Sequence, residues 1–349
     1  MHSFKHDFIG SLRFTSEQLS TLKAIGEYRG KQELYFTQTP EVLESLKKAS
    51  LIESSESSNR IEGVIAPHHR IEELVLHNTT PKNRSEQEIA GYRDALALIH
   101  ESSSHMPFTA NIVLQLHSIL YKYQAGRGGH WKIADNEITE ELPDGIKKVR
   151  FKPTPAVLTP ASMEELTKEY QQAKDLQDLE PLIIVPLAIF DFLCIHPFRD
   201  GNGRTARLLT LLLLYHFDYQ VGRFISLERI IEESKETYYE ALVKSSVDWH
   251  EGKHDIFPWL NYFWGMLLAA YREFEARVGT VKKGKGFKTE QIILAVEKKI
   301  GEFSINDIEK LCPGTSRDMI RAILRQLRDQ GKIHSVGAGR GAKWIKKSS

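Results

Sequence analysis

The chain has 349 residues, with 47 lysines and arginines against 46 aspartates and glutamates, so its formal net charge is only +1. This length supports two or three domains and excludes a small scaffold stapled by disulfides. The only two cysteines, Cys194 and Cys312, lie in apolar contexts, which indicates a reducing cytoplasm. Because no apolar run reaches the roughly 20 residues of a membrane span and no signal region opens the chain, we expect no membrane association.

The charge is distributed unevenly along the chain. From residue 281 onward, 16 lysines and arginines face 7 aspartates and glutamates, which leaves +9 in this part and −8 in residues 1–280. A flexible linker rich in glycine and lysine, residues 279–287, is the clearest predicted boundary. We therefore predict a helical N-terminal region (1–108), a central domain (109–278), this linker (279–287) and a basic C-terminal domain (288–349).

Capping patterns predict helices that begin near Thr15, Pro40, Ser85 and Thr109. We expect the first to end near Tyr28 and the third near Glu101. The fourth carries one apolar stripe, on which His117 is expected to be a core residue, formed by Ile112, Leu116, Ile119 and Leu120.

The helix predicted from Val42 to about Gly63 has an unusual end. Ser58 and Glu62 lie one turn apart on one face, and Gly63 occupies the position of a C-terminal cap. A carboxylate at a helix C-terminus opposes the helix dipole, so Glu62 is expected to have a cationic partner elsewhere in the chain. The alternative is an ordinary solvated glutamate beside Arg60.

Residues 126–158 interrupt the helical pattern. Glycines at 126, 128 and 129 precede a short strand predicted at Trp131–Ile133, and a turn at 143–145 leads to a second strand at Val149–Phe151. An isolated hairpin is marginally stable, so we interpret this one as a flap over a site.

The densest group of reactive side chains is the stretch 196–207, HPFRDGNGRTAR, between the apolar runs 182–195 and 208–214. This arrangement predicts a charged loop between two buried helices. Burying so much charge without a ligand is costly, which favours a site for a polyanion. The alternative is a charged surface loop of caps and ion pairs.

Each polar residue of this stretch has a chemistry that suits phosphates. Gly201 and Gly203 can open an anion-binding nest at a helix N-terminus, and Asp200 can hold Mg²⁺. Arg204 and Arg207 lie three residues apart and can bind one chain of phosphates. With His196 as the group that accepts a proton near neutral pH, the stretch predicts attack of a hydroxyl on a metal-bound nucleotide, while Phe198 is expected to anchor the loop.

Further helices are predicted from near Pro160, from Ser226 to about Lys244, and from Asp255 to Val278. The adjacent Tyr238 and Tyr239 point in different directions, so at most one is expected to stack on a ligand base. Beyond the linker, helices at about 289–300, 305–311 and 316–330 and a hairpin of 332–336 with 343–345 resemble a winged helix.

The third helix of this C-terminal domain has two distinct predicted faces. Ile320, Ile323, Leu324 and Leu327 form the buried face. Arginines recur at helical spacing on the other face and could lie along the phosphates of duplex DNA, unless they are only a solvated surface: Arg317, Arg321, Arg325 and Arg328.

The stretch 196–207 resembles the complete signature HxFx(D/E)GNGRxxR of the Fic family, whose members typically transfer AMP from ATP to protein hydroxyls. The resemblance covers most of residues 40–275 and implies a helical Fic core. It implies His196 as general base and Asp200 as the Mg²⁺ ligand. It implies nucleotide contacts from Gly201 and Gly203, from Asn202 to the α-phosphate, and from Arg204 and Arg207 to the β- and γ-phosphates.

Two further matches refine this resemblance. Gly203 favours nucleotidyl transfer, because the related Doc-like kinases carry lysine at this place. Ser58, Glu62 and Gly63 match the inhibitory-helix motif (S/T)xxxE(G/N), which implies that Glu62 pairs with Arg207 and displaces the γ-phosphate of ATP.

The sequence departs from the family pattern in two places. Gly129-His130-Trp131-Lys132 replaces the usual Gly-x-Tyr-Arg of the target-docking flap. Tyr238 and Tyr239 resemble the adenine-side motif, but Ser234 and Lys235 replace its usual Asn-Arg.

We therefore predict a mainly α, cytoplasmic, autoinhibited protein adenylyltransferase. It uses Mg²⁺ and ATP and modifies a Ser, Thr or Tyr hydroxyl of a protein, with self-modification included. Two alternatives are removal of AMP from a modified protein and a DNA-binding regulator whose Fic body senses nucleotide. Inhibition could act within one chain or between two copies of a homo-oligomer.

Overall fold

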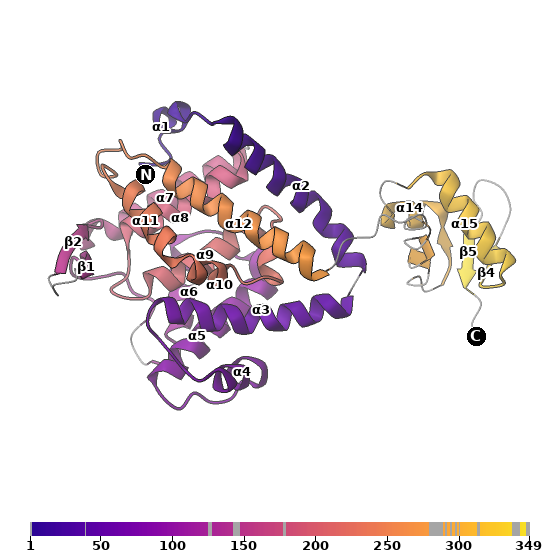
Figure 1. Ribbon diagram of the computed structural model, residues 1–349, viewed down its shortest axis with the longest axis horizontal. Coiled ribbons are helices and arrows are strands. Elements are labelled where there is room, and N and C mark those ends of the chain that lie inside the picture. Colours follow the sequence, from indigo (N-terminus) through magenta and orange to yellow (C-terminus); the bar gives the residue numbers. More distant parts are fainter. Residues whose placement is uncertain are drawn as a thin grey trace. The chain divides into compact units, whose positions relative to one another are not determined.

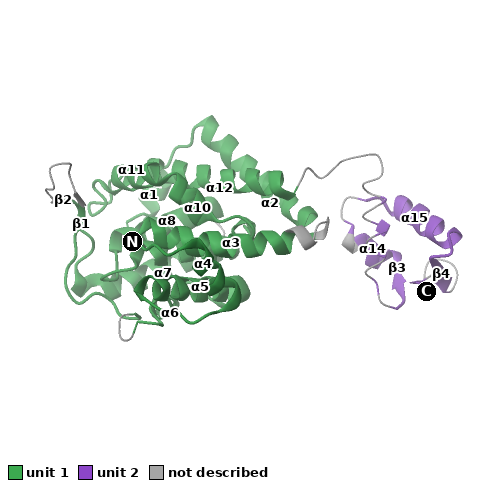
Figure 2. Cartoon of the chain, turned by 60° about the horizontal axis from the view of Figure 1, so that its bottom comes forward, with its two compact units in different colours: residues 1–279 green, residues 280–349 purple. Residues whose placement is uncertain are grey.

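A computed structural model describes residues 2–38, 40–124, 128–141, 147–176, 179–278, 289, 292, 293, 295, 296, 299, 301–312, 315–336 and 343–346. The chain forms two compact units, residues 1–279 and 280–349 (Figure 2). In the part of the first unit that the structure describes, the regular elements are helices and one two-stranded sheet, which confirms the mainly α prediction. Among the described residues, no helix is both long and apolar enough to cross a membrane.

The N-terminal region contains α1 (His6–Ser11), α2 (Ser16–Gln38), α3 (Pro40–Ile61), α4 (His68–His77) and α5 (Arg84–Ser102). The predicted capping box of Thr15 and Gln18 is present, with reciprocal bonds of 2.9 and 3.3 Å. The prediction that this helix ends near Tyr28 is wrong. The helix continues because α2 packs along α12 (Figure 1), where Tyr35 meets Phe274 edge to face at 5.5 Å.

Three details of this region differ from the prediction or were absent from it. Helices α1 and α4 were not predicted. The N-cap of α5 is Asn83, whose side chain accepts a hydrogen bond from the Glu86 amide at 2.9 Å, so the predicted Ser85 cap is wrong. Helix α6 (Ala110–Leu120) begins as predicted, with the Thr109 hydroxyl accepting from the Ile112 amide at 3.2 Å.

The core of this unit is built around α8 (Pro181–Ile195), whose residues from Leu182 to Ile195 are all buried. Helix α9 (Asn202–Tyr215) follows it, so the charged stretch joins two buried helices as predicted. Because Pro186 has no amide hydrogen, the Leu182 carbonyl cannot receive its normal helical bond. The indole of Trp264 from α12 (Phe257–Val278) donates to that carbonyl instead, at 2.7 Å.

The single helix predicted from Ser226 to Lys244 is two helices, α10 (Leu227–Glu233) and α11 (Lys235–Ser246). They are separated at Ser234, whose hydroxyl donates back to the Ile230 carbonyl at 2.7 Å. The other helical elements of the unit are α7 (Thr159–Leu176) and the short 3₁₀ turns η1 (Ser103–His105), η2 (Ala156–Leu158) and η3 (Val221–Arg223).

The hairpin consists of β1 (Ile138–Glu141) paired antiparallel with β2 (Lys147–Phe151). The strand predicted at Trp131–Ile133 is therefore wrong, because the Lys132 amide donates to the Pro197 carbonyl at 2.9 Å and not to a neighbouring strand. The turn predicted at 143–145 and the glycine at 126 lie outside the described residues.

The C-terminal unit contains β3 (Phe303–Ser304), α14 (Ile305–Leu311), α15 (Arg317–Asp329), β4 (Ile333–Val336) and β5 (Lys343–Lys346). Its strands form an antiparallel sheet in the order β3-β5-β4. The predicted apolar face of α15 is buried, together with Trp344 and with Ile292 and Val296. Strand β3 was not predicted. The linker 279–287 and half of the residues of the helix predicted at 289–300 lie outside the described residues.

The four arginines of α15 are all exposed, as expected. Three of them form ion pairs with neighbouring carboxylates: Arg317 with Glu309, Arg321 with Asp318, and Arg328 with Asp329. These pairs offset part of the positive charge of the face. The winged-helix interpretation and DNA binding both stay predictions.

Candidate active site

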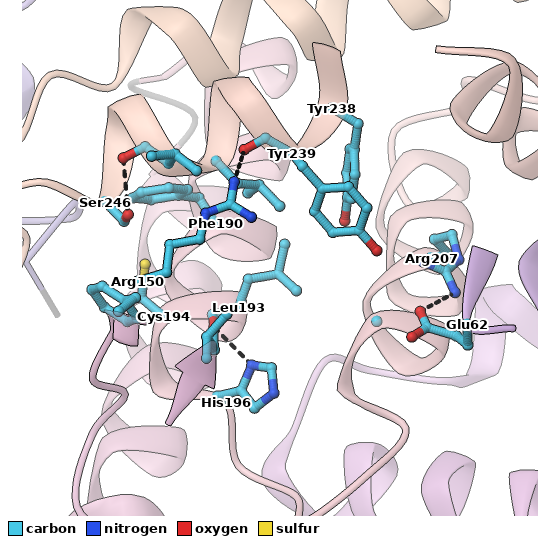
Figure 3. Close-up of a pocket in the computed structure, with 15 residues that line it drawn as sticks. Glu62, Arg150, Phe190, Leu193, Cys194, His196, Arg207, Tyr238, Tyr239 and Ser246 are labelled. Carbon is cyan, nitrogen blue, oxygen red and sulfur yellow. Dashed lines mark hydrogen bonds and ion pairs between the residues drawn. The ribbon is translucent and has the colours of Figure 1, made fainter. Parts of the chain in front are cut away.

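The stretch 196–207 borders a pocket of the first unit to which several elements contribute (Figure 3). The end of α3 supplies Glu62, β2 supplies Arg150, and α9 supplies Gly203 and Arg207. Residues of α8 and α11 form a mostly apolar wall that includes Phe190, Leu193, Cys194, Tyr238, Tyr239, Leu242 and Val243. The side chain of His196 lines the same pocket. The fold thus gathers side chains that are up to 184 positions apart in the sequence.

His196 is held at the end of α8 in a left-handed conformation, with φ 51° and ψ 60°. Its Nδ1 lies 3.3 Å from the Leu193 carbonyl, which can only accept, so the ring proton belongs on Nδ1. Burial lowers the pKa of His196 to about 4. The imidazole is therefore neutral at pH 7, and its Nε2 is available to accept a proton.

The loop after His196 is fixed by the side chain of Asn202. Its amide oxygen accepts from the Phe198 amide at 2.9 Å, and its amide nitrogen donates to the Phe198 carbonyl at 2.7 Å. Both polar atoms of the Asn202 side chain, which is predicted to contact the α-phosphate, therefore form hydrogen bonds within the loop. The phosphate contact of Asn202 stays a prediction.

His117 supports the same loop from α6 and has the structural role expected of it. Its ring stacks on Phe198 at 3.6 Å, with an angle of 3° between the planes. Its Nε2 donates to the Asp200 carbonyl and its Nδ1 accepts from the Gly129 amide, both at 3.0 Å. The sequence alone did not connect His117 with the loop.

Glycine is favoured at positions 201 and 203 of the loop for two different structural reasons. Gly201 has φ 79°, a left-handed conformation that favours glycine, directly before the N-terminus of α9. At Gly203 a β-carbon would collide with the carboxylate of Glu62. Gly203 therefore leaves the space at the helix N-terminus where an anion sits, and in this structure that anion is Glu62.

Asp200 has the properties of a carboxylate that could bind a cation. Its side chain is 63% exposed. Burial raises its pKa, but the charge of Arg204 and hydrogen bonds from Gly201 and Tyr121 outweigh this and hold the pKa below its usual value. No cluster of three or more His, Cys, Asp or Glu side chains that could hold a metal occurs among the described residues. Mg²⁺ typically takes one or two carboxylates and completes its shell with phosphates and water, so the single Asp200 fits it.

Arg207 is tied to the end of α3 by three contacts. Its Nε donates to the Ser58 hydroxyl at 2.8 Å, and its Nη2 donates to the Ser58 carbonyl at 2.9 Å and to Glu62 at 2.7 Å. The guanidinium is 3% exposed, whereas the Glu62 side chain is 31% exposed. Gly63 follows with φ 79° and ends the helix as expected.

Arg204 is used differently from Arg207. Its guanidinium, 2% exposed, pairs with Glu88 of α5 at 2.5 Å and donates to the Tyr121 hydroxyl at 3.1 Å. Sequence reasoning missed Glu88 as a partner, because its spacing from Ser85 indicated only a capping box at the start of the helix. The phosphate contact proposed for Arg204 stays a prediction.

Tyr238 and Tyr239 line the pocket from α11 but in different ways. Tyr238 is buried and packs against Trp259 and Tyr262. Tyr239 is half-buried, and its backbone carbonyl accepts a hydrogen bond from Arg150 of the hairpin at 2.9 Å. Arg150, which the sequence analysis did not single out, thus connects the hairpin to the pocket wall (Figure 3).

The comparisons with known proteins agree on one family. Residues 107–214 match the model of the Fic/DOC family. Over 112 residues the chain is 31% identical to "Protein adenylyltransferase Fic" of Nematostella vectensis. This aligned segment covers 30% of this chain and 23% of that protein. The chain spans less than half the length of the curated relatives it matches.

Two solved structures resemble the fold. A Fic family protein from Desulfovibrio desulfuricans G20 gives a TM-score of 0.61 at 20% identity and covers 97% of this chain and 98% of that chain. A Fic domain containing signaling protein from Bacteroides thetaiotaomicron gives 0.62 at 22% identity and covers 73% and 97%. At these identities the likeness shows the fold.

Proposed function

Because the chain belongs to the Fic/DOC family, we propose that it is a protein adenylyltransferase that transfers AMP from ATP to a Ser, Thr or Tyr hydroxyl. We further propose that Glu62 keeps the resting protein inhibited. The observation that carries the proposal is one pocket lined by a neutral imidazole, a helix N-terminus and a buried arginine, with the Glu62 carboxylate paired to that arginine and lying against Gly203.

The proposed reaction is an exchange at the α-phosphorus of ATP. The acceptor oxygen forms a bond to phosphorus, the bond to the bridging oxygen breaks, and pyrophosphate leaves. Nε2 of His196 takes the hydroxyl proton. Asp200 would hold Mg²⁺, which when bound neutralises charge on the phosphates.

The proposed inhibition follows from competition for Arg207. A γ-phosphate would need the guanidinium that Glu62 and Ser58 now occupy. ATP held without this contact would present its α-phosphorus in an unproductive orientation.

The test is transfer of label from α-phosphate-labelled ATP. Glu62→Gly and Glu62→Gln are expected to raise incorporation by about ten-fold or more, the change that corresponds to ~1.4 kcal/mol. His196→Ala in the Glu62→Gly background is expected to abolish it. Transfer from the γ-phosphate alone would make the protein a kinase, and no transfer by either Glu62 variant would refute the proposal.

Removal of AMP is a second candidate, favoured by the position of Glu62 in the same pocket as His196. In that reaction the carboxylate would orient a water for attack on the phosphorus of the attached AMP, the bond from phosphorus to the side-chain oxygen would break, and AMP and the free hydroxyl would be released. Incubation of the unaltered protein with a pre-modified target distinguishes the two, because release of AMP that depends on Glu62 would support removal.

A further inference from the structure

We propose that Lys132 is a positioning residue that holds His196 in place. Lys132 contacts the two carbonyls on either side of His196. Its amide donates to the Pro197 carbonyl at 2.9 Å, and its ammonium donates to the Ile195 carbonyl at 3.1 Å. The inference rests on the proposed function, in which His196 is the general base.

The conformation of His196 explains why it needs such support. A residue with a β-carbon at φ 51° is strained and persists only where the surroundings fix it. Ile195 is the last residue of α8, so its carbonyl has no helical partner. The ammonium of Lys132 supplies that partner and places a positive charge at the negative end of the helix.

Asn136 extends the same support by one residue. Its side-chain oxygen accepts from the Lys132 ammonium at 2.8 Å, and its nitrogen donates to the Phe198 carbonyl at 3.1 Å. Residues 132–136 therefore contact the carbonyls of Ile195, Pro197 and Phe198. Since Lys132 is only 5% exposed, these contacts are shielded from water.

The charges around His196 give Lys132 a second role. Beyond burial and the Leu193 carbonyl, the groups that act on the pKa of His196 are Lys132, Glu62 of α3 and Asp200 of the same loop. The two carboxylates raise this pKa, whereas Lys132 lowers it. Burial lowers the pKa of Lys132 itself to about 8, so the ammonium remains mostly charged at pH 7.

The first experiment is an NMR titration of the histidine Cε1 resonances in the full chain without nucleotide, with His196 assigned by His196→Gln. Lys132→Met is expected to shift the titration of His196 to higher pH, whereas Lys132→Arg is expected to leave it low. Lys132→Gln replaces the methionine variant if the latter does not fold. Lys168→Met, at an exposed position of α7, is the matched control.

The second experiment measures AMP transfer in the Glu62→Gly background. Lys132→Met is expected to lower kcat by roughly 10- to 100-fold with little change in KM for ATP, because the base is misplaced. It is also expected to move the acidic limb of the pH profile upward, and Lys132→Arg should restore much of the rate.

The two experiments distinguish failure of the proposed Lys132 role from failure of the proposed AMP transfer. An unchanged His196 titration in Lys132→Met, or unchanged kcat with an unmoved pH profile, would overturn the role of Lys132. If the Glu62→Gly parent transfers no AMP, the proposed function fails, and the NMR titration still decides whether Lys132 controls His196.

Discussion

Arg204 and Arg207 are one turn apart on α9, yet their buried guanidiniums have partners of different kinds. Arg204 faces Glu88, a carboxylate that is only 4% exposed. Arg207 faces Glu62, which is 31% exposed and borders the pocket. A buried charge needs a partner, but only the partner at the pocket edge can be exchanged for a ligand without opening the core. Glu88 is therefore structural, and Glu62 is replaceable.

Replacing Glu88 should accordingly destabilise the fold. Glu88→Gln leaves the buried Arg204 guanidinium without its nearest carboxylate, with only the exposed Asp200 remaining at 3.8 Å, and we expect the free energy of unfolding to fall by about 3 kcal/mol. Urea unfolding measures this change. Glu72→Gln is the control, because Glu72 is 49% exposed and pairs with His68 at 3.6 Å, so it should change stability by less than ~1 kcal/mol. Equal effects of the two substitutions would contradict the assignment.

Asp191 is a second buried carboxylate, close to the pocket wall but outside the proposed chemistry. It accepts hydrogen bonds from the Ser3 hydroxyl at 2.5 Å and from the Trp249 indole at 2.7 Å. Burial nevertheless raises its pKa to about 6. The N-terminal segment is thus attached to the core through a group that titrates in mildly acidic solution.

This raised pKa predicts a pH dependence of stability. Between about pH 4 and 6 the folded state holds the Asp191 proton more tightly than the unfolded chain, so stability falls as pH rises through this window. Asp191→Asn removes the titration. Urea unfolding at pH 4.5, 5.5 and 6.5 should show the original protein losing roughly 1–3 kcal/mol relative to the variant. Parallel stability curves would argue against a raised pKa.

At the scale of elements, α3 is anchored along its length to α10 and the start of α11. Ser54 donates to the buried Glu228 at 2.7 Å, and Glu53 pairs with Arg229 at 3.1 Å. At its last turn, the Lys235 ammonium donates to the Ile61 carbonyl at 2.9 Å. These contacts fix the helix end from which Glu62 reaches Arg207.

Loosening this end should weaken inhibition. Lys235→Met removes a cation at the C-terminus of α3, an interaction worth about 0.3–1 kcal/mol, so AMP transfer is expected to rise about two- to five-fold. The measurement is label incorporation beside Glu62→Gly, which should have the larger effect. Lys244→Met is the control on the same helix, because Lys244 pairs with Glu240 in an exposed position. An equal rise in both lysine variants would mean that the contact with Ile61 is unimportant.

At the scale of the whole molecule, the two units have separate cores. The C-terminal core contains Phe303, Ile308, Leu324 and Trp344, all contributed by residues after 280. A core of this size supplies only a few kcal/mol of stability. A substitution that creates one large cavity in this core should therefore unfold the C-terminal unit and leave the pocket of the first unit unchanged.

Trp344→Ala tests this independence. Loss of a buried tryptophan costs about 3–5 kcal/mol, so the variant should expose the C-terminal unit to limited proteolysis. Label transfer in the Glu62→Gly background should remain unchanged. A large loss of transfer would show that the C-terminal unit supports the reaction.

The sequence by itself determined the elements whose signals are local. The cap at Thr109, the apolar runs of α8 and α9, and the twelve contiguous residues 196–207 carry their chemistry in their spacing. Periodicity and capping act between residues within a turn or two, so they can be read without knowing the fold.

Only the tertiary structure decided which distant groups meet. The chain holds 46 aspartates and glutamates, and nothing local selects Glu88 for Arg204. Likewise, the Lys132 amide could have paired with a neighbouring strand, but it donates to the Pro197 carbonyl. The hairpin strands lie later in the chain, at residues 138–141 and 147–151. The break at Ser234 also depends on side-chain contacts. The charge and reach of a side chain are local properties, whereas its partner is chosen by packing among many equivalent groups.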